Sequence, residues 1–434
     1  MIQSVVFKKR AQTFLILFIL LIKSYFLFSV YKNQNLYGPV IFKELVSIGD
    51  SEHYLMIAKN IHDHRIFSDN NSTHLSESAV WRPPIWPFIM SFFFILTNNI
   101  FIILVLKVLL ETFFIVLIYR KLIKAKIVNN YLLLLLLPLE PFYQKYSITF
   151  LSESVTALFI FYAFYLFISL REEKRTNILI PIILSITILC HPVSIFFIGT
   201  LFGAYCLLNI KSKTKTIFLH LIIFIILTIA WPLRNQIVYN KGVFLTASQG
   251  SSLSKGWNER VVEDFNNVNG DLADANLNLK YVSQIEIDAV SNSIIDQSNL
   301  YKKATKIFFD QLPFNEKAAM VWIKLKSNFN PFPEVEKKGS LDQLAIIFRI
   351  LYLIIFMQSI YFLIKKRKLF WTDIRVRIAL FTFSIFVGQL IMASALYTGL
   401  RFNAIYSLSL LASFFIFNYD YVIHKVKNKY KLKE

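Results

Sequence analysis

Long apolar runs dominate this sequence, and they constrain its fold more than any other feature. They lie at 11–30, 100–118, 127–143, 154–170, 177–190, 193–210, 216–232, 343–364, 374–397 and 402–418, with a shorter run at 86–96. A helix of about 20 apolar residues crosses the hydrocarbon core of a bilayer. The runs therefore predict an all-α polytopic membrane protein with about 10–11 transmembrane helices, joined by short connections and two large loops.

The charge of the chain is unevenly distributed along it. The 47 Lys and Arg against 27 Asp and Glu give +20, a value typical of nucleic-acid-binding proteins. Six short stretches (1–10, 119–126, 171–176, 211–215, 365–377 and 420–434) carry +19, whereas the long polar stretches 31–85 and 233–342 carry −1 and 0. Such a pattern marks cytoplasmic loops of a membrane protein. It predicts a cell (plasma or inner) membrane location, extracytoplasmic polar loops, and no nucleic-acid partner.

These patterns divide the chain into six parts. We expect a first transmembrane helix with a basic tail at 1–30, an outer loop at 31–85, helices at 86–232, a large outer loop or lid at 233–342, helices at 343–418 and a basic tail at 419–434. The first run is too long for a signal peptide, which predicts an uncleaved anchor. The run at 86–96 is predicted to be a half-span, since eleven full crossings would place the basic C-terminus outside; a true short span is the alternative.

The first outer loop contains a predicted amphipathic helix after Gly49-Asp50. Apolar side chains recur at positions 54, 57, 58 and 61, the spacing of one helix face, which predicts a helix on the membrane surface. Asp50 then falls at the N-cap, where it either caps the helix or serves as a functional carboxylate. Four of the seven His residues, including His53, also lie in this loop, but their spacing matches no strong metal signature. A solvated polar face is the simpler interpretation, and a divalent metal stays an open alternative.

The end of this loop, Trp81-Arg82-Pro83-Pro84-Ile85-Trp86-Pro87, presents an arginine at the membrane. The prolines favour an extended backbone, and Arg82 lies between aromatic residues typical of the interface. Arg82 is either an interfacial anchor or a guanidinium directed at a phosphate, which its planar fork suits.

Further polar residues flank the later apolar runs. Glu140 and Glu153 lie near predicted outer helix ends, where a carboxylate either has a functional role or stabilises a helix N-terminus. Arg234-Asn235 opens the second loop, which is long enough for a helical lid and contains no Ser-His-Asp, Walker or Rossmann spacing. Arg401 lies in a short outer turn before the last run.

One ordered set of motifs runs from about residue 40 to 410. It comprises Gly49-Asp50 with Tyr54, then Arg82-Pro83-Pro84-x-Trp86-Pro87, Ser152-Glu153, Arg234-Asn235, Gly242-x-Phe244, Gly250, Gly256-x-Asn258 and Arg401-Phe402. This set resembles the GT-C membrane glycosyltransferases of the protein-mannosyltransferase-like group, which includes lipid A aminoarabinose transferases. Each motif is weak alone, and their order and membrane placement carry the resemblance.

The resemblance implies a GT-C-like fold and a polyprenyl-phosphate-linked sugar donor. Transfer to a lipid, glycan or protein acceptor of the cell envelope would occur on the extracytoplasmic face, with inversion. The family's catalytic carboxylate matches Asp50, and its phosphate-binding basic residue matches Arg82. The remaining candidates are Glu153 as a second catalytic carboxylate, and Tyr54, Arg234, Asn235 and Arg401 as substrate-binding residues.

Two departures limit what the resemblance implies. No proline follows Arg401-Phe402, which weakens a role for Arg401. Asp50 and Glu52 are separated by a serine, whereas protein-mannosyltransferases have an acidic pair, so a protein acceptor is not specifically implied.

Two other function classes use related lipids. A flippase or transporter usually has intramembrane ionisable groups and internal repeats. This chain has few charges in its apolar runs and no evident repeat, which favours an enzyme. An envelope polymerase usually has basic outer loops, and the charge balance of 233–342 is mild evidence against one.

Overall fold

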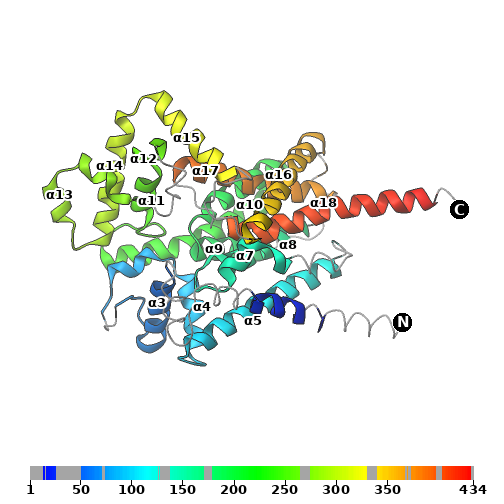
Figure 1. The fold of residues 1–434 in the computed structure, drawn as a ribbon, viewed down its shortest axis with the longest axis horizontal. Coiled ribbons are helices and arrows are strands. Elements are labelled where there is room, and N and C mark those ends of the chain that lie inside the picture. The colour runs from blue at the N-terminus through cyan, green and yellow to red at the C-terminus, as the bar shows by residue number, and fades with distance from the viewer. Residues whose placement is uncertain are drawn as a thin grey trace.

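The computed structural model describes residues 13–14, 16–25, 50–70, 74–125, 127, 137–170, 178–263, 274–329, 340–366, 369, 373–396 and 403–431. Every regular element within these residues is a helix, and none of them forms a strand. Helices α11 to α15 gather at one end of the molecule, and α18 (Ala404–Lys431) extends toward the opposite end (Figure 1).

The apolar runs of the sequence form helices of two lengths. Within the described residues, four segments are long and apolar enough to cross a membrane: α5 (Ile100–Lys124), Lys215–Tyr239 of α10, Ile346–Lys366 of α16 (Ser340–Lys366) and α17 (Ile374–Ala395). Six are shorter: Ile16–Tyr25, α4 (Ile85–Phe94), α8 (Glu153–Ile168), α9 (Leu179–Cys190), Ser194–Cys206 of α10 and Ala404–Asn418 of α18. The prediction of an all-α polytopic membrane protein is confirmed, while the number and direction of its crossings stay predictions.

Two predicted runs differ from the observed elements. The run at 127–143 is described only in part, and there the chain forms a short turn, η2 (Leu137–Leu139), and the start of α7 (Pro141–Ser147) instead of a long helix. The run at 86–96 forms α4, whose ten residues rise about 15 Å, half the thickness of a hydrocarbon core.

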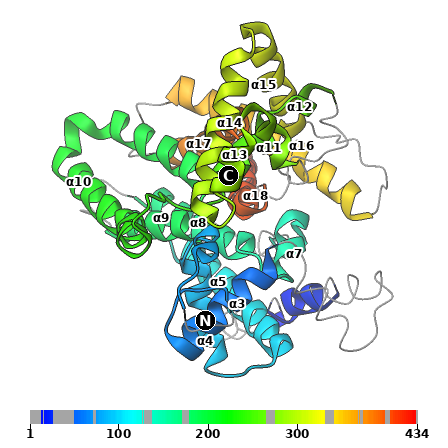
Figure 2. The same ribbon diagram turned by 90° about the vertical axis from the view of Figure 1, so that its left-hand side faces the viewer.

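Helix α10 (Ser194–Tyr239) joins two predicted runs in one 46-residue helix. The ring centroids of Tyr205 and His220 lie 6.4 Å apart, although 15 residues of a straight helix would rise about 22 Å. The helix therefore bends back on itself, and its two arms pack together (Figure 2). Its second arm ends at Tyr239, seven residues beyond the boundary at 232 predicted from hydropathy, because Pro232 is accommodated inside the helix.

Helix α8 lies at the centre of the apolar bundle, packed against α9, α18, α5 and α7. It is buried along most of its length. An apolar surface all around a helix is typical of such a central position. The N-terminus of α8 therefore gives a fixed base at which a site can be built.

The stretch predicted to be the first outer loop forms the expected amphipathic helix, α3 (Ser51–His64), where it is described. Its placement differs from the prediction, because the apolar face that includes Tyr54, Ile57 and Ala58 is buried against the rest of the protein instead of lying on a membrane surface. It packs against α4, and η1 (Glu77–Trp81) leads the chain back to α4. Arg82 follows η1 with an extended backbone, as its prolines predict.

The second outer loop forms a helical layer, residues 240–263 and 274–329, that we call the lid. Its elements are α11 (Gln249–Gly256), α12 (Arg260–Glu263), η4 (Ala275–Tyr281), α13 (Gln284–Ala289), α14 (Ile294–Gln311) and α15 (Phe314–Phe329). The side chains of Trp257, Val261, Phe308 and Met320 form a small apolar core within it. A Cβ at Gly250 would lie 1.9 Å from the Ser298 carbonyl oxygen, so close packing of α11 on α14 requires glycine there.

Candidate functional site

One cavity of about 660 Å³ lies between the first outer loop, the N-terminal end of α8 and the lid. The residues that line it come from segments far apart in the sequence. They are Asp50, Tyr54, Trp81, Arg82, Pro83, Leu151, Ser152, Glu153, His191, Pro192, Val193, Ile195, Phe196, Phe244, Leu245, Thr246, Ser248, Gln249, Ser251, Ser252, Leu253, Lys255, Lys302 and Leu396. Four candidates from the sequence, Asp50, Tyr54, Arg82 and Glu153, are therefore brought together.

Asp50 and Arg82 form an ion pair in the wall of this cavity. Arg82 Nη2 donates to Asp50 Oδ1 at 2.5 Å, with both side chains partly buried. Asp50 occupies the N-cap position of α3, as predicted, but its side chain makes no capping hydrogen bond. The capping interpretation of Asp50 is therefore wrong, because its carboxylate is directed to Arg82 instead. The guanidinium also lies 5.6 Å from the centre of the Tyr54 ring.

A second acid, Asp69, holds Arg82 through His53. Arg82 Nε donates to His53 Nδ1 at 3.0 Å, and His53 Nε2 lies 2.5 Å from Asp69 Oδ2. Because Nδ1 accepts, a neutral imidazole has its proton on Nε2 and donates it to Asp69. Burial raises the pKa of Asp69, but hydrogen bonds from His53, Ser78 and Ser76 outweigh burial and lower that pKa to about 2. Asp69 is therefore an anion at neutral pH and fixes the orientation of the Arg82 fork.

This chain of contacts does not favour His53 as a metal ligand. Both of its ring nitrogens are engaged, one by a cation and one by an acid. Within the described part of the chain, no three His, Cys, Asp or Glu side chains lie together as a metal site would need.

Glu153 faces the cavity from the first turn of α8. It is 2% exposed, and its Oε1 lies 3.8 Å from His191 Nε2 at the end of α9. Ser152, directly before it, lies 3.2 Å from the Tyr54 hydroxyl. Burial raises the pKa of the Tyr54 phenol, which is therefore protonated at neutral pH. A second carboxylate therefore lines the same cavity as the Asp50–Arg82 pair, and Tyr54 contacts both Arg82 and the residue before Glu153.

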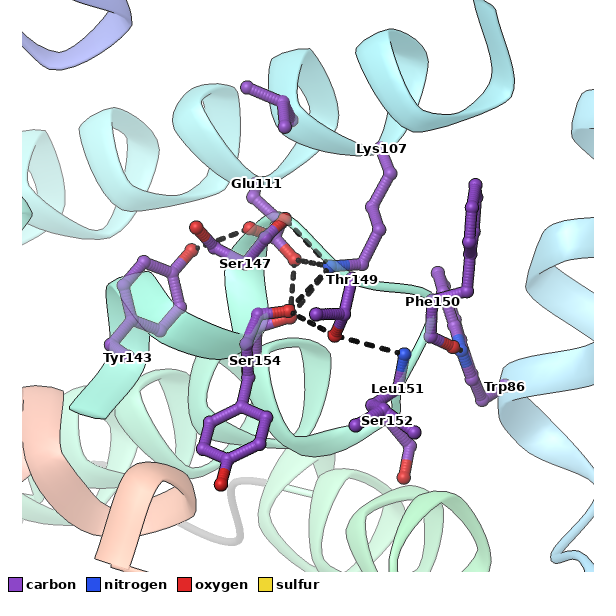
Figure 3. Close-up of polar contacts among 12 residues, drawn as sticks. Trp86, Lys107, Glu111, Tyr143, Ser147, Thr149, Phe150, Leu151, Ser152 and Ser154 are labelled. Carbon is purple, nitrogen blue, oxygen red and sulfur yellow. Dashed lines mark hydrogen bonds and ion pairs between the residues drawn. The ribbon is translucent and has the colours of Figure 1, made fainter. Parts of the chain in front are cut away.

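The turn that carries Ser152 and Glu153, residues 146–154, rests on a buried network that we call the floor (Figure 3). Lys107 Nζ donates to the carbonyls of Tyr146 and Ser147 at 3.2 and 3.0 Å and to Ser154 Oγ at 2.8 Å. Glu111, one turn along α5, lies 2.8 Å from Lys107 Nζ and accepts from Ser154 at 2.7 Å.

Three further side chains complete the floor from other elements. Lys23 Nζ donates to Glu111 at 2.8 Å, and the Tyr143 hydroxyl donates to Glu111 at 2.9 Å. Trp86, beside the turn, donates from its indole to the Phe150 carbonyl at 2.6 Å. Lys23, Lys107 and Glu111 are each about 1% exposed. A carboxylate shared by two ammonium groups therefore fixes the backbone beneath Glu153.

Lys255 and Lys302 line the lid side of the cavity and were not identified from the sequence. For Lys255 the sequence did contain a signal: polar residues at 248, 251, 252 and 255 recur at i, i+3, i+4 and i+7. That spacing predicts one polar helix face, and α11 turns this face to the cavity. His191 was missed for a different reason: it lies in an apolar stretch between two runs, where nothing distinguishes it from a helix end.

Arg234, Asn235 and Glu140 do not line the main cavity. Arg234 and Asn235 are near the C-terminal end of α10; Arg234 lines a different cavity and Asn235 is fully buried, so neither is placed as a substrate-binding residue of the main cavity would be. Arg401 lies outside the described residues. Glu140 has a structural role, since it caps α7 through the Tyr143 amide at 2.5 Å and accepts from the Tyr352 hydroxyl at 2.9 Å.

The charged side chains that line this cavity suit it to binding a ligand with charged groups. Its lining includes two acids, a guanidinium and two lysines of the lid. Comparison with known proteins adds nothing to this description: no family model, no curated protein and no solved structure matches the chain.

Proposed function

We propose that this protein is an integral membrane glycosyltransferase that moves a sugar from a polyprenyl-phosphate-linked donor to a cell-envelope acceptor on the extracytoplasmic face. One observation carries the proposal. Asp50, Arg82 and Glu153, chosen from the order of motifs in the sequence, line one 660 Å³ cavity beside apolar helices. The volume falls in the range of small-molecule sites, which suits a sugar.

The reaction needs a base beside the acceptor hydroxyl and a cation beside the leaving phosphate. An acceptor hydroxyl attacks the anomeric carbon, its proton passes to a carboxylate, and the bond between the sugar and the phosphate oxygen breaks. The lipid phosphate leaves with the bonding electron pair, so its negative charge increases. Arg82, oriented by His53 and Asp69, can stabilise that charge.

The Asp50–Arg82 ion pair supports separate roles for these two residues, with Arg82 binding phosphate and Asp50 accepting a proton. A donor phosphate would give the guanidinium a second anionic partner and weaken its ion pair with Asp50, whose carboxylate could then accept the proton. Glu153 is the other candidate base, because it faces the same cavity and is held in place by the floor.

Removal of either carboxylate tests the assignment of the base. In membranes containing the full chain, Asp50→Asn should lower transfer from a polyprenyl-phosphate sugar by about 10²–10⁴-fold, as expected for loss of a general base. Glu153→Gln should be tested in parallel, and Glu52→Gln is the matched control because Glu52 is an exposed acid of α3. A wild-type rate for Asp50→Asn would remove Asp50 from the mechanism.

The identity of the product tests the proposed class of reaction. Mass spectrometry of envelope glycans should show a sugar modification that disappears without this protein and in Asp50→Asn cells. If purified protein instead moves lipid-linked sugars across vesicles and transfers none of them, the alternative of a flippase replaces this proposal.

A further inference from the structure

A second cavity, of about 480 Å³, lies where α3 ends beside α4 and the outer end of α10. Its lining is shared with no part of the main cavity and consists of Ile61, Arg65, Ile66, Phe67, His74, Leu75, Phe88 and Arg234. Among these described lining residues two are arginines, one is histidine and none is an acid. The remaining five are apolar.

Arg234 is held rigidly in this cavity. Its guanidinium carbon lies 5.6 Å from the ring centre of Phe67, 5.3 Å from that of Trp231 and 5.2 Å from that of Tyr239. Nη1 donates to Asn235 Oδ1 at 3.0 Å. An arginine has five N–H donors, so most of them stay available to a ligand within the described structure. Three aromatic faces thus preorganise a cation that keeps its hydrogen-bonding capacity.

Arg65 reaches the same cavity through an uncommon backbone conformation. It is the C-cap of α3, with φ 59° and ψ 26°, the left-handed conformation in which many helices end. Asn60 secures the chain that follows, since its amide donates to the carbonyls of Ser68 and Asn70 at 2.8 and 2.6 Å. This helix end places a second guanidinium on the cavity wall.

Exposed apolar side chains lie on the same two helices that contribute Phe88 and Arg234 to the cavity. Phe88 and Phe92 on α4, and Ile229 and Leu233 on α10, are all more than two-fifths exposed. Arg234 is 19 residues from Lys215 at the start of the candidate span, a rise of about 28 Å in a helix. A hydrocarbon core is about 30 Å thick, so a bilayer crossed by this segment would place Arg234 near one edge.

We propose that this second cavity binds the phosphate headgroup of an anionic membrane lipid, whose acyl chains lie along the exposed faces of α4 and α10. Arginine forks match phosphate oxygens, and the absence of acids among the described lining residues leaves the positive charge uncompensated. The five apolar lining residues, with the exposed apolar side chains on α4 and α10, favour a ligand with chains over a free anion. This inference is independent of the proposed reaction.

Native mass spectrometry of the purified full chain tests the ligand class. Phosphatidylglycerol should be retained in preference to phosphatidylcholine, and glycerol 3-phosphate, which has the same anion without chains, should not be retained. Equal retention of phosphatidylcholine would overturn the charge selectivity. Retention of glycerol 3-phosphate as strong as that of the lipid would show a soluble-phosphate site instead.

Two variants test the location of the site. Arg234→Gln and Arg65→Gln should each weaken phosphatidylglycerol retention about fivefold, the usual contribution of one basic residue to binding an anionic lipid. Lys59→Gln, on the exposed face of α3 and outside both cavities, is the charge-matched control and should behave as wild type. Arg65 is exposed, so its variant keeps the test decisive if Arg234→Gln fails to fold. Wild-type retention by a folded Arg65→Gln would overturn the proposal.

Discussion

The floor and the lid of the main cavity are held in place by different kinds of polar contact. Beneath Glu153, the network of Lys23, Lys107 and Glu111 is about 1% exposed and reaches the backbone of 146–154. The lid joins the first outer loop through Lys241, which lies 3.0 Å from Glu77 and 2.7 Å from Asp296, with all three side chains about a third exposed.

The difference indicates which side of the cavity can move. An unpaired charge inside an apolar bundle is very costly, whereas a solvent-exposed ion pair contributes little. The floor should therefore keep its shape, and the edge of the lid that Lys241 holds should be the easier part of the cavity wall to move. On the proposed function, Glu153 would be a fixed group, and Lys255 and Lys302 would approach a ligand only when the lid is seated.

The largest expected effect comes from breaking the floor. Glu111→Gln removes the single carboxylate shared by Lys23 and Lys107 and leaves two buried ammonium groups without their counter-ion. We expect a loss of about 3–5 kcal/mol in the free energy of unfolding, measured by thermal or denaturant unfolding in detergent micelles.

A matched substitution in the lid provides the control for Glu111→Gln. Glu286 is also paired with a lysine, Lys303, but on the exposed surface of α13 and α14. Glu286→Gln should leave the unfolding transition where it is. Similar transitions for both variants would contradict the distinction between floor and lid.

The second effect concerns the inner edge of the lid, where α15 meets the end of α17. Lys324 is fully buried and donates to the carbonyls of Ser394 and Leu396, each at 3.0 Å, with its ammonium 3.9 Å from the centre of the Trp257 ring. At about pH 10, where the buried amine is neutral, Lys324→Met leaves these two carbonyls unpaired, which should cost about 2 kcal/mol. Faster labelling of a cysteine placed on α15 would report the looser lid, and unchanged labelling would contradict it.

The same lysine should make the lid sensitive to pH. Burial lowers the pKa of Lys324 to about 7, against 10.5 in an unfolded chain. Between these two pKa values the unfolded state binds more protons than the folded state, so the stability of the docked lid should rise from pH 7 to about 10. Below pH 7, Lys324 is protonated in both states, and its contribution to stability should no longer change with pH. The melting temperature of wild type, compared with that of Lys324→Met across this range, measures the contribution; parallel curves would exclude it.

The smallest effect is expected at the outer edge of the lid. Lys241→Gln removes both partly exposed ion pairs and should cost about 1 kcal/mol. The change should appear in hydrogen exchange of α14 and should diminish in high salt, since screening already weakens such pairs. A loss as large as that of Glu111→Gln would show that lid and floor are equally rigid.

The sequence predicted the parts of the site that local pattern determines. The apolar spacing of α3 located Asp50 at its N-terminus, and the prolines after Arg82 predicted its extended backbone. Whether Asp50 caps the helix or faces Arg82 could not be predicted, because 32 residues separate the two partners and only tertiary packing joins them.

The positions of Arg234 and of the lid lysines show the limit of such prediction. Arg234 belongs to the motif order that located Asp50 and Arg82, yet the extension of α10 past Pro232 carries it to a second cavity. Lys255 and Lys302 reach the main cavity because Gly250 lets α11 and α14 pack closely. Close approach of two helices depends on three-dimensional packing that hydropathy and charge do not record.

The pairing of Lys23 with Glu111 has a consequence for biogenesis. The two residues are 88 positions apart, so Lys23 leaves the ribosome well before its counter-ion is synthesised. A lone lysine at the centre of an inserting helix costs about 2.5–3.5 kcal/mol on insertion scales. The first helix should therefore insert into the lipid inefficiently on its own and remain next to the insertion machinery until α5 has been synthesised. In that case, Lys23→Leu would speed the first insertion step while weakening the finished protein.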